Sequence, residues 1–339
     1  MKKFAANVAL IALGLVCLPA LAQTSAGPAA EAKKPSADAK PAAEPKAAEP
    51  KAAEAKAAPA AKPKRARAAP GAVVEALEMP AWVERQGEGR LPLTPGMVLK
   101  SLDQVHTGAG ARVLLRTADG SSVKLGGNAA LVIEAMQTTK ERVFQAALKV
   151  AEGAFRFTTE TFAKFRGKRE VSVTFATVTA GIRGTDLWGK SSPDKQIVCL
   201  IEGKVEVTAP GEAALSMDQP MQFYVREKDK SQPVAPVPAE QLKIWAAETE
   251  TQPGEGVARR GGKWHVTAVT SASANEALKV YEALRAAGYA AELRPAKVDN
   301  KRVYGVRLSQ FASKKDTEAV VTGLKQRSGL GEYDYKIGS

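Results

Sequence analysis

Cysteine and histidine are scarce in this chain, and their scarcity excludes several classes of protein. Of the two cysteines, Cys17 lies in an N-terminal apolar stretch, and Cys199 lies in the apolar run Ile197–Ile201, which is typical of a buried strand. One such cysteine cannot form a disulfide framework. The two histidines, His106 and His265, lie in unrelated segments, so no His/Cys/carboxylate cluster has metal-ligand spacing. We therefore expect no metal and no other cofactor.

Catalytic motifs are also missing from the sequence. There is no Ser/His/Asp or Cys/His arrangement, and no glycine-rich loop follows a strand in the manner of a phosphate-binding site. Paired carboxylates of the glycosidase kind stay open, because such partners meet only in the fold, and 36 acidic residues offer pairs by chance. We expect a protein without catalytic residues that is not an enzyme.

The N-terminus has the pattern of an export signal. Lys2 and Lys3 precede an apolar stretch from Val8 to Leu21 that ends in the small-x-small pattern Ala20-Leu21-Ala22. The stretch is shorter than the roughly 20 residues of a membrane-spanning helix, and the residues before Cys17 do not fit a lipid-modified cysteine. We predict a signal peptide over residues 1–22, cleaved after Ala22, a periplasmic protein, and membrane contact only through this segment before cleavage. An uncleaved anchor is the alternative.

The formal net charge of +13 is unevenly distributed. Residues 23–70 carry ten basic and five acidic side chains and consist almost entirely of Ala, Pro, Lys and Glu, so we expect a disordered linker. It serves either as a spacer or as a tether with weak attraction to anionic wall polymers. Residues 263–339 carry thirteen basic and eight acidic side chains. Such a bias attracts nucleic acid, anionic lipid or an anionic polymer, and export argues against nucleic acid.

Residues 72–225 show short strands and turns. The clearest unit is a hairpin, Arg112–Thr117 and Ser121–Leu125, joined at Asp119-Gly120. Helical periodicity is scarce in this region, so we predict an all-β domain of the sandwich or β-helical type. The further strands expected are Ala154–Thr158, Val171–Val178, Gln196–Ile201 and Lys204–Thr208.

Several spaced motifs in this region resemble the FecR-type periplasmic domain over roughly residues 86–225. They are Gly96–Leu99, Asp103–Gly108, the turn at Asp119–Ser121, Gly181–Asp186 and Ile201–Val207. The resemblance by itself implies little about function, because similar domains occur in many exported proteins, and we expect this domain to contact another envelope protein. Within it, Arg183 and Asp186 are either a ligand site or residues that hydrogen-bond neighbouring backbone where Gly181 and Gly184 shape a bend.

Residues 226–262 are expected to be a linker with one short helix at Ala239–Thr249. Leu242 and Trp245 share a face of this helix, and we expect Trp245 to pack on the β-domain. A free partner-binding helix is the alternative. Pro253 to Gly262 predict a loose connection.

The C-terminal residues 263–339 contain an internal duplication at an offset of 40 residues. Val266 aligns with Val306, and Ala272-Ser273 aligns with Ala312-Ser313. Ser273 and Ser313 are each suited to cap a helix, because an acidic residue follows three positions later. The element order predicts an α+β domain, βαββαβ, with both helices on one face of an antiparallel sheet.

Strand alternation predicts which side chains stand on the uncovered sheet face. Those expected to point to the helices are Trp264, Val266, Ala268, Leu293, Tyr304, Val306 and Leu308. Those expected on the open face are His265, Thr267, Val269, Glu292, Arg294, Val303, Gly305 and Arg307. The open face is small, mixed and basic, and it suits an extended polymer.

Residues 263 to about 337 resemble the SPOR family, the sporulation-related repeat that binds peptidoglycan glycan strands lacking stem peptides. The run Tyr304–Ser313, with Leu324 beyond it, carries the resemblance. It implies glycan contacts at Thr267, Thr270, Val303 and Gly305, and we add neighbouring open-face residues. The predicted glycan-binding set is His265, Thr267, Thr270, Arg294, Val303, Gly305 and Arg307. An ordinary solvated face or a protein-docking face is the alternative, whereas RNA binding would need stacking aromatics on the central strands.

We therefore expect a multidomain, non-enzymatic periplasmic adaptor. Its partners would be peptidoglycan glycan strands and another envelope protein bound by the β-domain. The alternative is an envelope signalling or scaffold protein whose two domains both bind proteins.

Overall fold

The computed structural model describes residues 71–160 and 165–339, so the predicted signal peptide and Ala/Pro/Lys-rich linker lie outside the described residues. The first sixteen strands form the β-domain. They are β1 (Ala72–Glu78), β2 (Ala81–Arg85), β3 (Gly89–Pro92), β4 (Val98–Leu99), β5 (Gln104–Thr107), β6 (Arg112–Thr117), β7 (Ser122–Leu125), β8 (Ala130–Thr138), β9 (Val143–Thr158), β10 (Lys168–Phe175), β11 (Val178–Ser192), β12 (Lys195–Thr208), β13 (Leu215–Met217), β14 (Gln222–Glu227), β15 (Lys230–Ser231) and β16 (Ala235–Pro236). The all-β prediction is confirmed.

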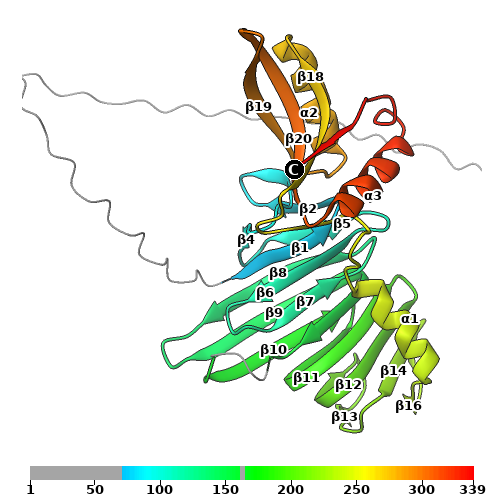
Figure 1. Ribbon diagram of the computed structural model, residues 1–339. Coiled ribbons are helices and arrows are strands. Elements are labelled where there is room, and N and C mark those ends of the chain that lie inside the picture. Colours follow the sequence, from blue (N-terminus) through cyan, green and yellow to red (C-terminus); the bar gives the residue numbers. More distant parts are fainter. Residues whose placement is uncertain (1–70, 161–164) are drawn as a thin grey trace, which may run out of the picture. The chain divides into compact units, whose positions relative to one another are not determined.

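The β-domain consists of two sheets that share three long strands (Figure 1). One sheet runs β1–β6–β7 and continues through one half each of β9, β11 and β12 to β14. The other runs β3–β2–β5–β8 and continues through the opposite halves of β9, β11 and β12, with β10 and β13. Apolar side chains from both sheets belong to a single buried core. The long strands therefore hold the two sheets together covalently.

Two glycines mark where the shared strands pass from one sheet to the other. Gly184 has φ of +64° and Gly203 has φ of +96°, and a Cβ atom at position 203 would lie 2.5 Å from the carbonyl oxygen of Gly184. Only glycine fits such an approach without strain. The register of β11 against β12 shifts between Arg183 and Asp186, at the same bend. Gly181 has no positive φ and lies in the regular ladder, so the predicted role in shaping the bend belongs to Gly184 alone.

The hairpin at Asp119-Gly120 is confirmed, since β6 and β7 pair around it and Gly120 has φ of +89°. Asp119 is buried and pairs with Arg169 at 2.6 Å. The hydroxyls of Thr117 and Ser121 also donate hydrogen bonds to this carboxylate. The carboxylate therefore connects the turn to β10, although Asp119 and Arg169 lie far apart in sequence.

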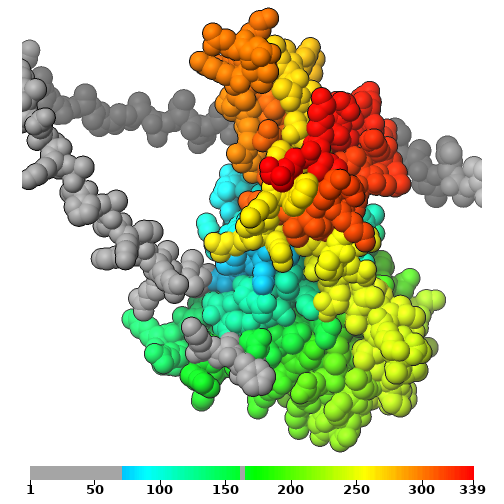
Figure 2. Space-filling view, in the orientation of Figure 1, coloured from blue at the N-terminus to red at the C-terminus, as the bar shows by residue number. Residues whose placement is uncertain are grey.

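Helix α1 (Ala239–Thr249) covers the outer face of the sheet that contains β9, β11, β12 and β14; in Figure 2 it is the yellow segment against the green strands. The rings of Trp245 and Trp188 stack with centroids 4.8 Å apart and planes 4° apart. Glu248 forms an ion pair with Lys190, with the two charged atoms 2.8 Å apart, and Glu250 forms one with Arg156 at the same distance. The predicted packing of Trp245 on the β-domain is confirmed.

The C-terminal region has the predicted βαββαβ order. The six elements in that order are β18 (Trp264–Ser271), α2 (Ala274–Ala286), β19 (Ala291–Val298), β20 (Lys301–Phe311), α3 (Lys314–Lys325) and β21 (Lys336–Gly338), and the short strand β17 (Val257–Arg259) precedes them. The strands pair antiparallel in the order β19–β20–β18–β21. Both helices contact this sheet, and Ser273 and Ser313 cap them by accepting hydrogen bonds from the backbone N–H groups of Glu276 and Asp316. The predicted caps are confirmed.

The segment from Pro253 to Gly262 differs from the loose connection expected. It contains β17, which pairs with β1 and, at Ala258, with Phe311 of β20. Val257 and Ala258 are buried. The glycines and the proline produce turns around an ordered strand here, because long-range pairing supplies the hydrogen bonds that the local sequence does not predict.

Candidate functional site

The face of the C-terminal sheet opposite α2 and α3 carries polar side chains in rows that run across neighbouring strands. Thr267 lies opposite Arg307 on one side and Lys336 on the other, and Arg307 lies opposite Glu292. Because paired residues on neighbouring strands lie on the same face about 5 Å apart, these four side chains form one row. The row offers two cationic donors, one hydroxyl and one carboxylate.

A second row lies next to it. Thr270 is opposite Gly305, and Gly305 is opposite Arg294. A Cβ atom at position 305 would meet only the carbonyl oxygen of Arg294, at 3.6 Å, so the middle of this row is flat and open. The Arg294 guanidinium donates to Glu292, with Nε 2.9 Å from the carboxylate. The two rows are thereby connected.

A β-bulge in β18 explains why Thr270 stands on this face. The register against β20 passes from Thr267–Arg307 to Val269–Val306, so one residue is inserted. The prediction that Val269 points outward is therefore wrong. Val269 packs against the buried core together with Val306, and the residue after it returns to the open face. Simple alternation cannot find the bulge, because it assumes a strict period of two.

The remaining inward predictions hold for the residues near the helices. Val266, Ala268, Val306 and Leu308 are buried. Trp264 and Tyr304 are partly buried against the same core. Leu293 is 37% exposed, because it lies where the β19–β20 hairpin extends away from the helices; the hairpin is the orange projection in Figure 2.

Arg307 lies between Glu292 and Thr267 in the first row of the open face. Its Nε atom is buried and has no hydrogen-bond partner. Glu292 lies across from it on β19, but the carboxylate of Glu292 accepts from Arg294. A buried N–H donor without a partner is costly, and an acceptor can reach this Nε only if the Arg307 side chain shifts to expose it.

His265 lies beside this row, at the end near β21. It pairs with Gly338, where a Cβ atom would come within 2.6 Å of the imidazole ring. Burial lowers the pKa of His265, and the charges of Arg307 and Arg294 lower it further. The ring is therefore neutral at physiological pH and offers both a donor and an acceptor.

The structure brings most of the predicted site residues together, with Val303 at the margin. Val303 lies opposite Ala296 on the extended part of the hairpin and presents an apolar side chain. Lys336 was not among the predicted residues. The alternation of Tyr335 and Ile337, which pack on the core, could have placed it on the open face.

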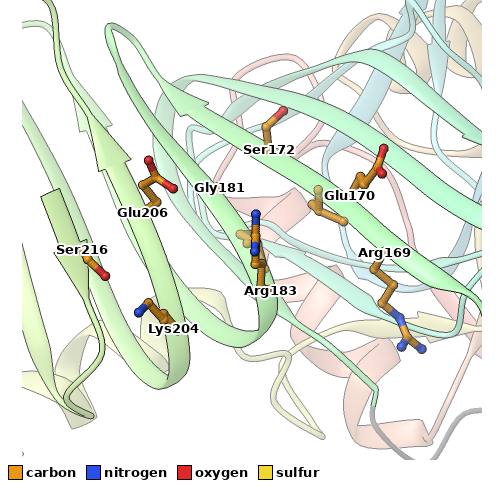
Figure 3. Close-up of a pocket in the computed structure, with 10 residues that line it drawn as sticks. Arg169, Glu170, Ser172, Gly181, Arg183, Lys204, Glu206 and Ser216 are labelled. Atoms are coloured by element: carbon orange, nitrogen blue, oxygen red, sulfur yellow. The ribbon is translucent and has the colours of Figure 1, made fainter. Parts of the chain in front are cut away.

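Arg183 and Asp186 of the β-domain do not form a common site. Asp186 forms a two-point ion pair with Arg156, at 2.9 Å and 2.7 Å, rather than hydrogen bonds to backbone. Arg183 is exposed at the rim of a groove on the other sheet (Figure 3).

Residues 71–160 and 165–339 contain no evident metal site and no membrane-spanning helix. No group of three or more His, Cys, Asp or Glu side chains in these ranges could hold a metal ion. No helix within the same ranges is long and apolar enough to span a membrane. Burial raises the pKa of the Cys199 thiol to about 12, so this residue is an inert part of the core.

Comparison with known proteins gives two family matches. Residues 103–206 match the FecR protein family, and residues 261–333 match the SPOR domain. Domains of these two kinds bind or signal in the bacterial envelope and are not catalytic. No curated protein matches the chain.

Two crystal structures from Parabacteroides distasonis, each described as a candidate anti-sigma factor, also match. One is 13% identical and covers 59% of this chain and 97% of its own, with a TM-score of 0.35. The other is 15% identical and covers 67% and 91%, with a TM-score of 0.34. These likenesses are too distant to support a conclusion. From the family matches, the chain carries a FecR-like β-domain followed by a SPOR-like domain.

Proposed function

We propose that this protein is a non-enzymatic, cofactor-free adaptor that binds peptidoglycan glycan strands through the open sheet face of its SPOR-like domain. The observation that supports this most directly is the cross-strand row of Thr267, Arg307 and Lys336. Sugars present hydroxyl and carbonyl acceptors at regular intervals, and a row of donors on a flat sheet matches an extended polymer of that kind.

The unpartnered Arg307 donor adds an energetic reason. When the Arg307 side chain shifts so that its buried Nε meets a ligand acceptor, the cost of leaving that donor unpaired is recovered, and a hydrogen bond from a charged group contributes about 1.5–3 kcal/mol. His265, Thr270 and Arg294 surround it with further donors and acceptors, and Gly305 allows a sugar ring to lie close to the backbone. Val303 supplies apolar contact at the end of the face.

We further propose that the protein acts in the periplasm after cleavage of its signal peptide behind Ala22, and that the FecR-like domain contacts another envelope protein. The Lys2–Lys3 and Ala20–Ala22 patterns support export. Membrane contact would then be limited to the signal segment before cleavage, and nucleic acid would not be a partner.

Co-sedimentation with sacculi tests the glycan proposal. The mature chain would be mixed with intact sacculi and with sacculi from which an amidase has removed the stem peptides. We expect the larger bound fraction on the stripped sacculi, because stem peptides obstruct close approach of a flat sheet to the glycan. A bound fraction that is no larger on stripped sacculi than on intact sacculi would contradict the proposal.

The second candidate function is a signalling or scaffold protein in which both domains bind other proteins. The ordered junction favours it, since β17 joins β1 of the FecR-like domain to β20 of the SPOR-like domain and could relay binding between them. A photo-crosslinker at position 267 separates the two functions: crosslinks to an envelope protein, without retention on sacculi, would support the scaffold.

A further inference from the structure

A groove of about 530 Å³ lies on the FecR-like domain (Figure 3). Its floor is a row across four neighbouring strands, formed by Ser172, Gly181, Glu206 and Ser216. The residues that alternate with them, such as Ile182 and Val205, are buried in the core. The row therefore lies on the outer surface of the sheet.

Three charged groups of this groove have no ion-pair partner among the described residues. Arg183 and Lys204 are exposed and lie directly opposite each other on β11 and β12, and like charges in that position destabilise a sheet. Within the described part of the chain neither side chain forms an ion pair, and neither does Glu206. By contrast, Arg169 at the far end is paired with Asp119. Two cations and one carboxylate are thus left available over the same floor.

Neither backbone conformation nor packing requires a glycine at position 181 in the floor. Gly181 does not have a positive φ, and a Cβ atom there would meet only the carbonyl oxygen of Glu206, at a comfortable 3.8 Å. A glycine inside a regular strand weakens the strand, and it often marks a place where a ligand approaches the backbone. A side chain at this position would stand in the groove, so its absence keeps the groove open.

We propose that this groove binds a short extended peptide that carries both a carboxylate and an ammonium group. The carboxylate lies on Arg183 and Lys204, the ammonium group on Glu206, and the peptide backbone over Gly181. The hydroxyls of Ser172 and Ser216 offer hydrogen bonds at either end. A purely anionic polymer fits less well because Glu206 and Glu170 lie beside the cations. The volume is in the range of small-ligand sites.

This inference rests on the proposed contact of the FecR-like domain with another envelope protein, and the occupant is a segment of that protein. The stem peptide of peptidoglycan, which carries similar groups, is the competing outcome. Titration of the mature chain with two probes distinguishes them. One probe is the fluorescently labelled peptide Ala-Glu-Ala-Lys-Ala, blocked at both ends. The other is the labelled stem peptide released from sacculi by an amidase. We expect saturable binding of the Ala-Glu-Ala-Lys-Ala probe, and binding of the stem peptide alone would overturn the assignment to a protein segment.

Gly181→Val is the decisive variant, because valine suits a strand and fills the groove. We expect it to weaken probe binding at least tenfold while the thermal midpoint stays at or above that of the wild type. Arg183→Gln and Lys204→Gln should each weaken binding about fivefold. Lys149→Gln, an exposed cation on β9 outside the groove, should leave binding unchanged. Failure of both probes to bind the wild type, or equal affinity of the folded Gly181→Val variant, would overturn the proposal.

Discussion

The carboxylate of Asp316, buried at the start of α3, accepts a hydrogen bond of 2.9 Å from the backbone N–H of Val257 in β17. The same oxygen accepts from Gly254 at 2.7 Å and from Gly256 at 3.2 Å. Because β17 pairs with β1 and contacts β20, this one side chain orders the segment that leads from the FecR-like domain into the SPOR-like domain.

Replacing Asp316 by alanine should destabilise the protein. Three backbone N–H groups would lose their acceptor, and a hydrogen bond to a charged group is worth about 1.5–3 kcal/mol. Partial compensation by water reduces the sum, so we expect the free energy of unfolding to fall by about 3–5 kcal/mol. Urea unfolding of the mature chain measures it. Asp334→Ala removes the same charge from a side chain that is 90% exposed and should change little; equal midpoints for the two variants would exclude this role of Asp316.

Asp316 should also make stability depend on pH. Burial raises its pKa, but hydrogen bonds from Ser313 and from the backbone of Val257, Gly254 and Gly256 lower it more, so the pKa lies below its ordinary value of 3.8. A carboxyl with a depressed folded pKa stabilises the protein above its unfolded pKa, and this stabilisation is lost as pH falls through the folded pKa.

We therefore expect urea midpoints to decline below about pH 4 and expect Asp316→Asn to flatten that decline. Glu78 acts in the opposite direction, because burial raises its pKa despite hydrogen bonds from Gln252 and Arg112. Its contribution is present at low pH and declines as pH rises through its folded pKa. An Asp316→Asn variant with the same acid profile as the wild type would contradict the assignment.

If the open sheet face binds glycan, substitutions on it should weaken binding to the cell wall. Arg307→Ala should weaken retention on stripped sacculi about tenfold or more, and Thr267→Ala should weaken it less, because a neutral hydrogen bond contributes only about 0.5–1.5 kcal/mol. Neither change should move the thermal midpoint much. Lys314→Ala, on α3 away from the face, is the charge-matched control. Equal, salt-sensitive losses for Arg307→Ala and Lys314→Ala would indicate diffuse electrostatics instead of a site.

The stack of Trp245 on Trp188 predicts that the docking of α1 on the β-domain depends mainly on Trp245. Trp245→Ala should lower the free energy of unfolding by about 2–3 kcal/mol, since it removes a partly buried ring from its stack on the fully buried Trp188. Faster amide exchange over Ala239–Thr249 would accompany the loss. Ile244, adjacent in sequence and 60% exposed, provides the control, because Ile244→Ala should change neither quantity. Unaltered exchange in Trp245→Ala would show that the ion pairs alone hold the helix.

Export predicts a definite mature terminus. N-terminal sequencing of periplasmic protein should begin at Gln23, because cleavage follows the small residue Ala22. A full-length chain recovered in the membrane fraction would instead support the uncleaved anchor.

Local chemistry made much of this protein predictable from sequence. Ser273 and Ser313 predict helix starts, because an acidic residue that completes a cap follows each of them. Asp119-Gly120 predicts a hairpin, because glycine adopts the left-handed conformation that the turn requires. Most of the open face followed from alternation. All these signals depend on residues within a few positions of one another.

What the tertiary structure decided depends on partners far apart in the chain. Val269 turned inward because the pairing with Val306 inserts a bulge, and β17 formed because β1 and Asp316 supply its hydrogen bonds. The floor of the groove joins residues 172, 181, 206 and 216 only through strand register. Register is set by how whole strands fit a shared core, and no local pattern in the sequence records that fit.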